Sequence, residues 1–191
     1  SVYSISKRDQ EEMCLTIGRA YRIPTVALRY FNVYGPRQAL SNPYTGVAAI
    51  FSSRILNNHP PCIFEDGLQS RDFTHVSDIV QANLLAMESN DADYEVFNVG
   101  TGRPLTVLNI AEALIKSLSS SVDMNIVREY REGDIRHCYA DISKIRDQLG
   151  FQPKVKFEKG ISEFVGWVRG EEARDQFEKS RRELEEKGLT L

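Results

Sequence analysis

Strand-like and helix-like segments alternate along most of the chain, and this order constrains the fold more than any other feature. Residues 4–21 carry an apolar stripe at helical spacing, and residues 25–31 alternate apolar and polar side chains as a half-buried strand does. The pattern predicts further helices over 46–57, 77–87, 106–118, 141–149 and 160–168, and strands over 62–64, 71–76, 94–99 and 124–127. Such alternation is typical of the α/β class, which is the fold class that we expect.

Several residues mark where these elements should begin and end. Residues 32–37 contain a turn signal after the strand 25–31, and ligands bind at the carboxyl ends of strands in open α/β sheets. Ser77 or Asp78 is expected to cap one helix and Thr106 another, whereas Gly150 should end a third. Residues 171–187 are mostly charged, so we expect a solvent-exposed helical tail there.

Composition excludes several classes of protein. A chain of 191 residues suits one domain or slightly more, and its formal net charge of −3 gives no sign of a nucleic-acid or membrane-surface partner. No apolar run approaches the roughly 20 residues that span a bilayer. The three cysteines are far apart in sequence, which argues against a disulfide framework and fits a reducing cytoplasm. The three histidines lack metal-ligand spacing, so no metal site is expected.

Tyr3 and Lys7 are separated by about one helical turn and should project from the same face of the first helix. A phenol with a reference pKa of about 10 is a poor base, but a nearby ammonium favours the phenolate. Such a pair can exchange a proton with a sugar or alcohol hydroxyl. The same spacing also occurs by chance in many helices, and the catalytic interpretation therefore depends on the motifs downstream.

Two of those motifs place polar side chains next to turns. Asn32 follows a strand and could bond a polar ligand, although an Asx-turn role is the simpler interpretation. Arg71 enters a strand after a glycine turn, where its planar guanidinium could grip a phosphate. The alternative for Arg71 is an ion pair with Asp66 or Asp72.

Two more motifs lie in the second half of the chain. Asn98 precedes the Gly-x-Gly of residues 100–102, which is not a dinucleotide-binding fingerprint because Pro104 intervenes before the next helix. Arg131 lies on a second glycine-containing turn, at residues 131–136. Each arginine alone suggests a surface ion pair, whereas Arg71 and Arg131 together could neutralise a diphosphate.

Taken together, the motifs resemble the extended short-chain dehydrogenase/reductase family, and within it the NAD-dependent nucleotide-sugar epimerases and dehydratases. The resemblance runs from Tyr3 to about residue 168. It is carried by Tyr3-x-x-x-Lys7, Arg29-Tyr30-Phe31-Asn32-Val33-Tyr34-Gly35-Pro36, Gly67-x-Gln69-x-Arg71-Asp72-Phe73-x-His75-Val76, Phe97-Asn98-Val99-Gly100 and Arg131-x-Gly133-Asp134. Residues 35–47 are most similar to the dTDP-L-rhamnose 4-epimerase group, with UDP-glucose 4-epimerases close by.

The resemblance implies a role for each matching residue. Tyr3 would be the acid/base at the sugar 4-hydroxyl, and Lys7 would lower its pKa and hold the nicotinamide ribose. Phe31 would line the nicotinamide pocket. The positions implied to contact the nucleotide sugar are Asn32 and Asn98 for the sugar, Arg71 and Arg131 for the diphosphate, Thr45, Gly46, Ile63 and Phe64 for the base, and Asp134 for its ribose.

The resemblance also implies that this chain is the carboxyl-terminal part of a Rossmann-type fold with a small α/β substrate-binding domain. Residues 1–34 would complete the NAD-binding domain, residues 35–170 would bind the nucleotide sugar, with 72–100 returning to the Rossmann sheet, and residues 171–191 would form the charged tail. The family's glycine-rich loop precedes the Tyr-x-x-x-Lys motif, and the chain starts without a methionine directly at that motif. We therefore expect a fragment that is inactive and holds NAD weakly by itself.

The expected activity of the whole protein is 4-epimerisation of a dTDP- or UDP-sugar through a 4-keto intermediate, with NAD as cofactor, in a cytoplasmic homodimer. Family members dimerise through the helix that carries Tyr-x-x-x-Lys, and the apolar stripe of Met13, Ile17 and Tyr21 could serve that interface or belong to the core. Two alternatives stay open: a 4,6-dehydratase or decarboxylase of the same family, and a non-catalytic subunit that binds nucleotide sugars.

Overall fold

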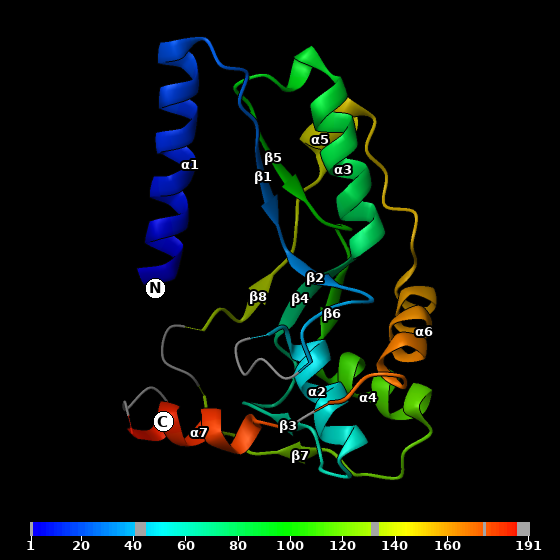
Figure 1. Cartoon of the computed structure of the whole chain (residues 1–191). Helices are drawn as coiled ribbons and strands as arrows, with labels where there is room; N and C mark the ends of the chain where they lie inside the picture. The colour runs from blue at the N-terminus through cyan, green and yellow to red at the C-terminus, as the bar shows by residue number, and fades with distance from the viewer. Residues whose placement is uncertain (1, 41–44, 131–133, 174, 187–191) are drawn as a thin grey trace.

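The computed structural model describes residues 2–40, 45–130, 134–173 and 175–186. They form an α/β structure with two apolar cores, one above the other in Figure 1. The helices are α1 (Val2–Tyr21), α2 (Val47–Leu56), α3 (Val76–Glu88), α4 (Val107–Leu118), α5 (Ser143–Leu149), α6 (Phe157–Val168) and α7 (Phe177–Glu186). The strands are β1 (Ala27–Tyr30), β2 (Asn32–Tyr34), β3 (Cys62–Ile63), β4 (Ser70–His75), β5 (Val96–Val99), β6 (Pro104–Thr106), β7 (Asn125–Ile126) and β8 (His137–Cys138).

The upper core forms around the parallel pair β1 and β5. Side chains of α3, α5 and β5 fill this core, and Phe97 and Phe151 are fully buried in it. The amphipathic α1 stands beside β1 and buries only Leu15 and Gly18. A β-carbon at Gly18 would lie 2.8 Å from Cβ of Thr25, so glycine lets the helix end approach the chain that enters β1.

The lower core lies between the sheet around β4 and the helices α2, α4 and α6. β4 pairs in parallel with β2 and β8 and antiparallel with β6. The small parallel pair of β3 and β7 lies further down. Both views place the amino-terminal end of α1 at the height of β2 and β4, so the start of the chain lies at the level where the two cores meet.

The carboxylate of Asp72, on β4, is fully buried and joins three segments. It accepts hydrogen bonds from the backbone N–H groups of Thr101 (2.9 Å) and Gly102 (2.8 Å), just after β5, and from that of Ala140 (3.2 Å), just after β8. The Thr101 hydroxyl also donates to it at 2.6 Å. Because hydrogen bonds to backbone donors compensate a buried carboxylate, Asp72 holds β4, the end of β5 and the segment after β8 together.

A second buried carboxylate, that of Asp78 on α3, accepts hydrogen bonds from the backbone N–H groups of Lys154 (2.9 Å) and Val155 (3.2 Å). These bonds fix the extended segment that connects α5 to α6. The N-cap of α3 is His75, whose Nδ1 accepts from the Ser77 backbone N–H, so the expectation of a cap at Ser77 or Asp78 was wrong. Thr106 caps α4 in a capping box, as the sequence predicted.

Two further expectations from sequence are corrected by the structure. Residues 32–34 form strand β2 rather than part of a turn, because they pair with β4 over Asn32↔Phe73 to Tyr34↔His75. The charged tail is anchored at its start: Arg54 on α2 is buried, bonds Glu178 at 3.0 Å, and places its guanidinium 4.3 Å from the ring centre of Phe177. A cation–π contact and an ion pair therefore dock α7 against α2.

Replacing Asp72 with asparagine tests the buried junction. The amide NH₂ would face backbone donors, so we expect the free energy of unfolding in urea to fall by about 2–4 kcal/mol. The control is Asp147→Asn, because Asp147 is exposed and should change stability by less than about 0.5 kcal/mol. Equal stability of the two variants would contradict the role given to Asp72.

Candidate functional site

Tyr3 and Lys7 lie on the same face of the first turns of α1, as the spacing predicted. The Lys7 ammonium is 5.7 Å from the centre of the Tyr3 ring, and Tyr3 is 71% exposed to solvent. Lys7 Nζ also donates to Gln10 Oε1 at 3.3 Å. The arrangement leaves the phenol accessible and places a cation near it, whereas the catalytic role of the pair stays a prediction.

An ion pair holds this helix against β1. The guanidinium of Arg29 on β1 donates to both carboxylate oxygens of Glu11 on α1, at 2.7 and 2.6 Å. This bond lowers the pKa of the Glu11 carboxyl below its ordinary value. Near the other end of α1, Arg19 donates to the carbonyl of Tyr94 at 2.8 Å. These contacts, with buried Leu15 and Gly18, fix the direction of α1 and therefore the place of Tyr3.

The residues predicted to line the nicotinamide and sugar pockets lie where β1 and β5 end. Phe31 separates β1 from β2, is half-buried, and donates its backbone N–H to the Val99 carbonyl at 3.3 Å. Asn32 is half-buried in β2. Asn98 is half-buried in β5, and its amide donates to the Asp141 carbonyl at 3.3 Å. The structure therefore brings Phe31, Asn32 and Asn98 to one region at the junction of the two cores.

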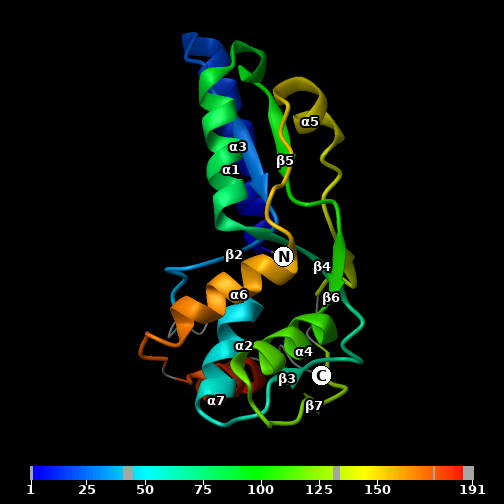
Figure 2. The same cartoon turned by 90° about the vertical axis from the view of Figure 1, so that its right-hand side faces the viewer.

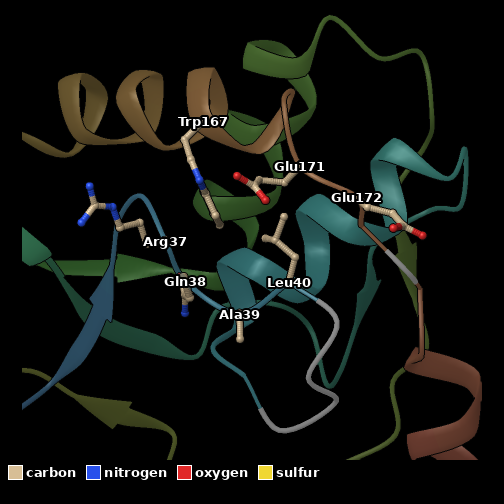
Figure 3. Close-up of a pocket in the computed structure, with 7 residues that line it drawn as sticks. All are labelled: Arg37, Gln38, Ala39, Leu40, Trp167, Glu171 and Glu172. Atoms are coloured by element: carbon tan, nitrogen blue, oxygen red, sulfur yellow. The ribbon is translucent and has the colours of Figure 1, made fainter.

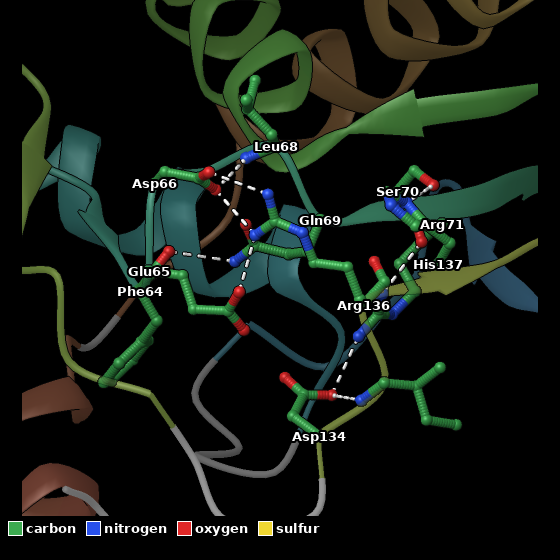
Figure 4. Close-up of polar contacts among 11 residues, drawn as sticks. Phe64, Glu65, Asp66, Leu68, Gln69, Ser70, Arg71, Asp134, Arg136 and His137 are labelled. Carbon is green, nitrogen blue, oxygen red and sulfur yellow. Dashed lines mark hydrogen bonds and ion pairs between the residues drawn. The ribbon is translucent and has the colours of Figure 1, made fainter.

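Arg71, the predicted diphosphate ligand, pairs with Asp134, another predicted site residue (Figure 4). Its Nη2 donates to Asp134 Oδ1 at 2.8 Å, and its Nη1 donates to the carbonyls of Ser70 (2.8 Å) and Arg136 (3.3 Å). The alternative raised from the sequence, an ion pair with Asp66 or Asp72, does not occur among the described residues, although Arg71 does form an ion pair. The sequence could not decide this, because Asp134 is 63 residues away and reaches Arg71 only through the pairing of β4 with β8.

Sequence reasoning missed Arg136. Its guanidinium bonds Asp66 through both of its terminal nitrogens, each at 2.7 Å, and Glu65 at 2.6 Å. These bonds lower the pKa of the Asp66 carboxyl well below its usual range. The local sequence offered little signal, because residues 131–136 contain two arginines and two acidic residues and do not show which arginine would reach the acidic turn at residues 65–67.

The residues predicted to contact the nucleotide base differ in burial. Ile63 is fully buried in the lower core, whereas Phe64, Thr45 and Gly46 are half-buried. Arg131 lies outside the described residues, so its partnership with Arg71 stays a prediction.

A pocket of about 380 Å³ lies beside Thr45, between the segment after β2 and the end of α6 (Figure 3). It is lined by Arg37, Gln38, Ala39, Leu40, Trp167, Glu171 and Glu172. Gln38 connects it to the predicted base region, because Gln38 Nε2 lies 3.5 Å from Thr45 Oγ1. None of the predicted site residues lines this pocket.

The described part of the chain contains no group of three or more His, Cys, Asp or Glu side chains arranged to hold a metal ion. No helix among the described residues is both long and apolar enough to cross a membrane.

A family model described as "NAD dependent epimerase/dehydratase family" matches residues 1–100, which is more than half of the chain. The chain belongs to this family. It is 32% identical over 171 residues to a dTDP-L-rhamnose 4-epimerase of Burkholderia thailandensis, covering 90% of this chain and 47% of that protein. This finding agrees with the resemblance drawn from the motifs.

Solved structures agree with that membership. A UDP-glucose 4-epimerase of Thermotoga maritima, solved with UDP-glucose, is 40% identical with a TM-score of 0.80 over 88% of this chain and 53% of its own. A UDP-glucuronic acid 4-epimerase of Bacillus cereus, solved with UDP-glucuronic acid and NAD, is 31% identical with a TM-score of 0.80, over 89% and 53% of the two chains. The chain thus spans about half the length of these family members, and the predicted Rossmann-type α/β class is confirmed.

The donors on this chain fit one end of NAD. A phenol and an ammonium on one helix face suit the hydroxyls of the nicotinamide ribose, and Phe31, half-buried between β1 and β2, offers part of an aromatic ring. The sequence contains no Gly-x-Gly-x-x-Gly run of the kind that cradles the pyrophosphate of the cofactor in Rossmann folds.

Replacing Glu11 with glutamine tests how α1 is held. Loss of the ion pair with Arg29 should lower the hydrogen-exchange protection of α1 amides at pH 7 by roughly two- to fivefold, because Arg29 is more than half exposed and solvent screens the pair. The folded-state pKa of Glu11 is depressed, so its contribution is present above the unfolded pKa of about 4.3 and is lost as pH falls through the folded value.

The difference between wild type and variant should therefore disappear under acidic conditions. Glu12→Gln is the matched control. Glu12 is exposed, and its ion pair with Arg8, at 3.6 Å, lies within α1 and does not connect α1 to β1. Equal protection of α1 in wild type and Glu11→Gln at pH 7 would contradict this account.

Proposed function

We propose that residues 1–191 supply the catalytic tyrosine–lysine pair and the substrate-binding region of an NAD-dependent 4-epimerase that acts on a dTDP- or UDP-sugar through a 4-keto intermediate. The observation that carries the proposal is the open Tyr3 phenol with the Lys7 ammonium 5.7 Å from its ring, on a helix whose amino-terminal end lies at the level where the two cores meet. Family membership and the 4-epimerases among the relatives support it.

In this proposal Tyr3 takes the proton from the sugar 4-hydroxyl and gives a proton back to the 4-keto oxygen. Lys7 favours the phenolate by its charge and binds the nicotinamide ribose. Bound NAD supplies a reversible hydride acceptor at carbon 4 of the sugar, and Phe31 lines the nicotinamide pocket. Within this chain, Tyr3 and Lys7 control the proton that accompanies each hydride transfer.

The nucleotide end is proposed to stay fixed while the sugar turns. Arg71 grips the diphosphate together with Arg131, and Asp134 accepts from the ribose of the nucleotide. Asn32 and Asn98 contact the sugar, and Thr45, Gly46 and Phe64 border the base. Ile63, which the resemblance also implied for the base, is fully buried in the lower core and is left to support Phe64 from within β3. A fixed nucleotide contributes affinity, and a loosely held pyranose can present either face of carbon 4 to the hydride acceptor.

Three further properties belong to the same proposal. The domain boundaries 1–34, 35–170 and 171–191 are proposed as the resemblance implies them. The pairing of β5 with β1 supports the return of 72–100 to the upper sheet, and the upper core also takes Ile145, Leu149 and Phe151 from the 35–170 segment. The homodimer is supported by Met13, Ile17 and Tyr21, which are exposed by 50–74% on α1. A cytoplasmic location is supported by the cysteines, which are free in the described structure.

Binding of UDP to the 191-residue chain tests the diphosphate grip. Arg71→Gln removes a charge-assisted donor, so the Kd for UDP measured by calorimetry should rise by about 10- to 100-fold. The Kd for uridine, which has no phosphate, should change little. Arg146→Gln is the control, because Arg146 pairs only with its exposed neighbour Asp147 among the described residues. A wild-type chain that binds neither UDP nor dTDP would contradict the proposed substrate class.

Turnover tests Tyr3 in a protein that joins this chain to the cofactor-binding half found in the relatives. Tyr3→Phe should lower kcat by about 10²- to 10⁴-fold with nucleotide-sugar affinity kept. NMR of the products then separates the alternatives: inverted stereochemistry at carbon 4 supports an epimerase, whereas a 4-keto-6-deoxy or decarboxylated sugar identifies a dehydratase or decarboxylase. Undiminished kcat in Tyr3→Phe would remove Tyr3 from the reaction.

A further inference from the structure

Two turns that are distant in sequence meet at Arg136 (Figure 4). The first turn, Glu65–Gly67, follows β3. The second, Asp134–Arg136, leads into β8. The Arg136 guanidinium donates to Asp66 Oδ1 and Oδ2 and to Glu65 Oε2 at 2.6–2.7 Å. Such a forked contact fixes direction as well as distance, which a single ammonium contact does not.

The first turn needs this support because its backbone is unusual. Glu65 has a positive φ of 53°, in the left-handed region that favours glycine, and Gly67 has a φ of 75°. Asp66 Oδ1 also accepts from the Leu68 backbone N–H at 2.9 Å, and Gln69 Nε2 donates to the Phe64 carbonyl at 3.0 Å. The conformation of the turn determines where Phe64 lies, and the Arg136 guanidinium stabilises the turn through its bonds to Glu65 and Asp66.

The backbone of Arg136 contacts Ser70 and Arg71 on β4. Its carbonyl accepts from the Ser70 backbone N–H at 2.9 Å and from Arg71 Nη1 at 3.3 Å. The next residue, His137, pairs with Ser70 in the sheet, and its Nδ1 lies 2.8 Å from Ser70 Oγ. One residue therefore contacts the turn that carries Phe64 through its side chain and the guanidinium of Arg71 through its carbonyl.

Arg71 itself is oriented rather than free. Its side chain is 16% exposed, and its bonds to Ser70, Arg136 and Asp134 use three of the five N–H donors of a guanidinium within the described structure. Two of its five N–H donors are therefore left within the described structure, enough for two hydrogen bonds to a phosphate.

We propose that Arg136 is a positioning residue, which fixes the turn carrying Phe64 relative to Arg71 so that both contact the same nucleoside diphosphate. This inference rests on the proposed function. Arg136 does not touch the nucleotide; it acts through Arg71 and through the turn at residues 65–67.

The competing interpretation is an ordinary surface ion pair. Arg136 and Asp66 expose 40% and 53% of their side chains, and isolated pairs at such exposure contribute little to stability. A surface pair would therefore leave both stability and nucleotide affinity unchanged when it is altered. A positioning residue would change the affinity for the diphosphate more than it changes stability, and this difference separates the two interpretations.

The test uses the 191-residue chain with UDP and uridine as probes. Arg136→Lys keeps the charge and loses the fork, so we expect the Kd for UDP to rise by about 10-fold, with a smaller change for uridine and a nearly unchanged Tm. Arg146→Lys is the matched control and should bind UDP as the wild type does. Asp66→Asn should reproduce the effect of Arg136→Lys, and it carries the test if that variant fails to fold.

A double-mutant cycle tests whether Arg136 acts through Arg71. If Arg136 acts through Arg71, the effects of Arg136→Lys and Arg71→Gln on UDP affinity are less than additive. Full additivity, or a wild-type Kd for UDP in both Arg136→Lys and Asp66→Asn, overturns the inference and leaves the proposed function intact. Failure of the wild-type chain to bind UDP and dTDP overturns both.

Discussion

The buried carboxylate of Asp72 is the interaction on which the rest of the structure depends. Backbone donors after β5 and after β8 converge on it, and Gly100 leaves room for this approach, because a β-carbon there would lie 2.6 Å from Asp72 Oδ2. Successive side chains on a strand point to opposite sides, so burying Asp72 turns the preceding Arg71 toward the turn at 134–136. Arg71, the residue predicted to bind the diphosphate, thus takes its direction from its buried neighbour.

The two cores explain why the site lies where it does. The upper core holds β1 and β5, whose ends present Phe31 and Asn98, and the lower core holds β4, which presents Arg71. The crossing from β1 to β2 at Phe31 and the Asp72 junction connect the two. A ligand that contacts all of these residues must lie across the junction, and an elongated molecule with a sugar at one end and a base at the other has the shape for that position.

Much of the fold followed from local sequence. Apolar periodicity predicted α1 through α6, with only the bounds changing by a few residues, and Thr106 and Gly150 predicted the ends that they form. The strand β2 was missed because Tyr34-Gly35-Pro36 is a strong turn signal, and pairing with β4 overrode it for residues 32–34. The cap of α3 was misplaced because histidine is an uncommon N-cap, and its ring nitrogen replaced the hydroxyl or carboxylate that was expected.

The sequence predicted which residue types the candidate site contains, but not which residues bond to one another in it. Spacing alone brought Tyr3 and Lys7 together, since both lie on one helix. The partners of Arg71 and Arg136 depend on which strands are neighbours, and Asp134 and Asp66 are each about 60–70 residues from the arginine that they bind. The docking of α7 through Arg54 and Phe177 is equally non-local, and for that reason the sequence predicted only a solvent-exposed helical tail.

The most direct measurement is a titration of the ¹⁵N-labelled 191-residue chain with UDP, followed through its backbone amide signals. If UDP binds as proposed, saturable shifts are concentrated at residues 45–46, 64–71 and 134–138, and α5 is unaffected. Shifts confined to the pocket between Arg37 and Trp167, or no shifts at millimolar UDP, would contradict the proposal.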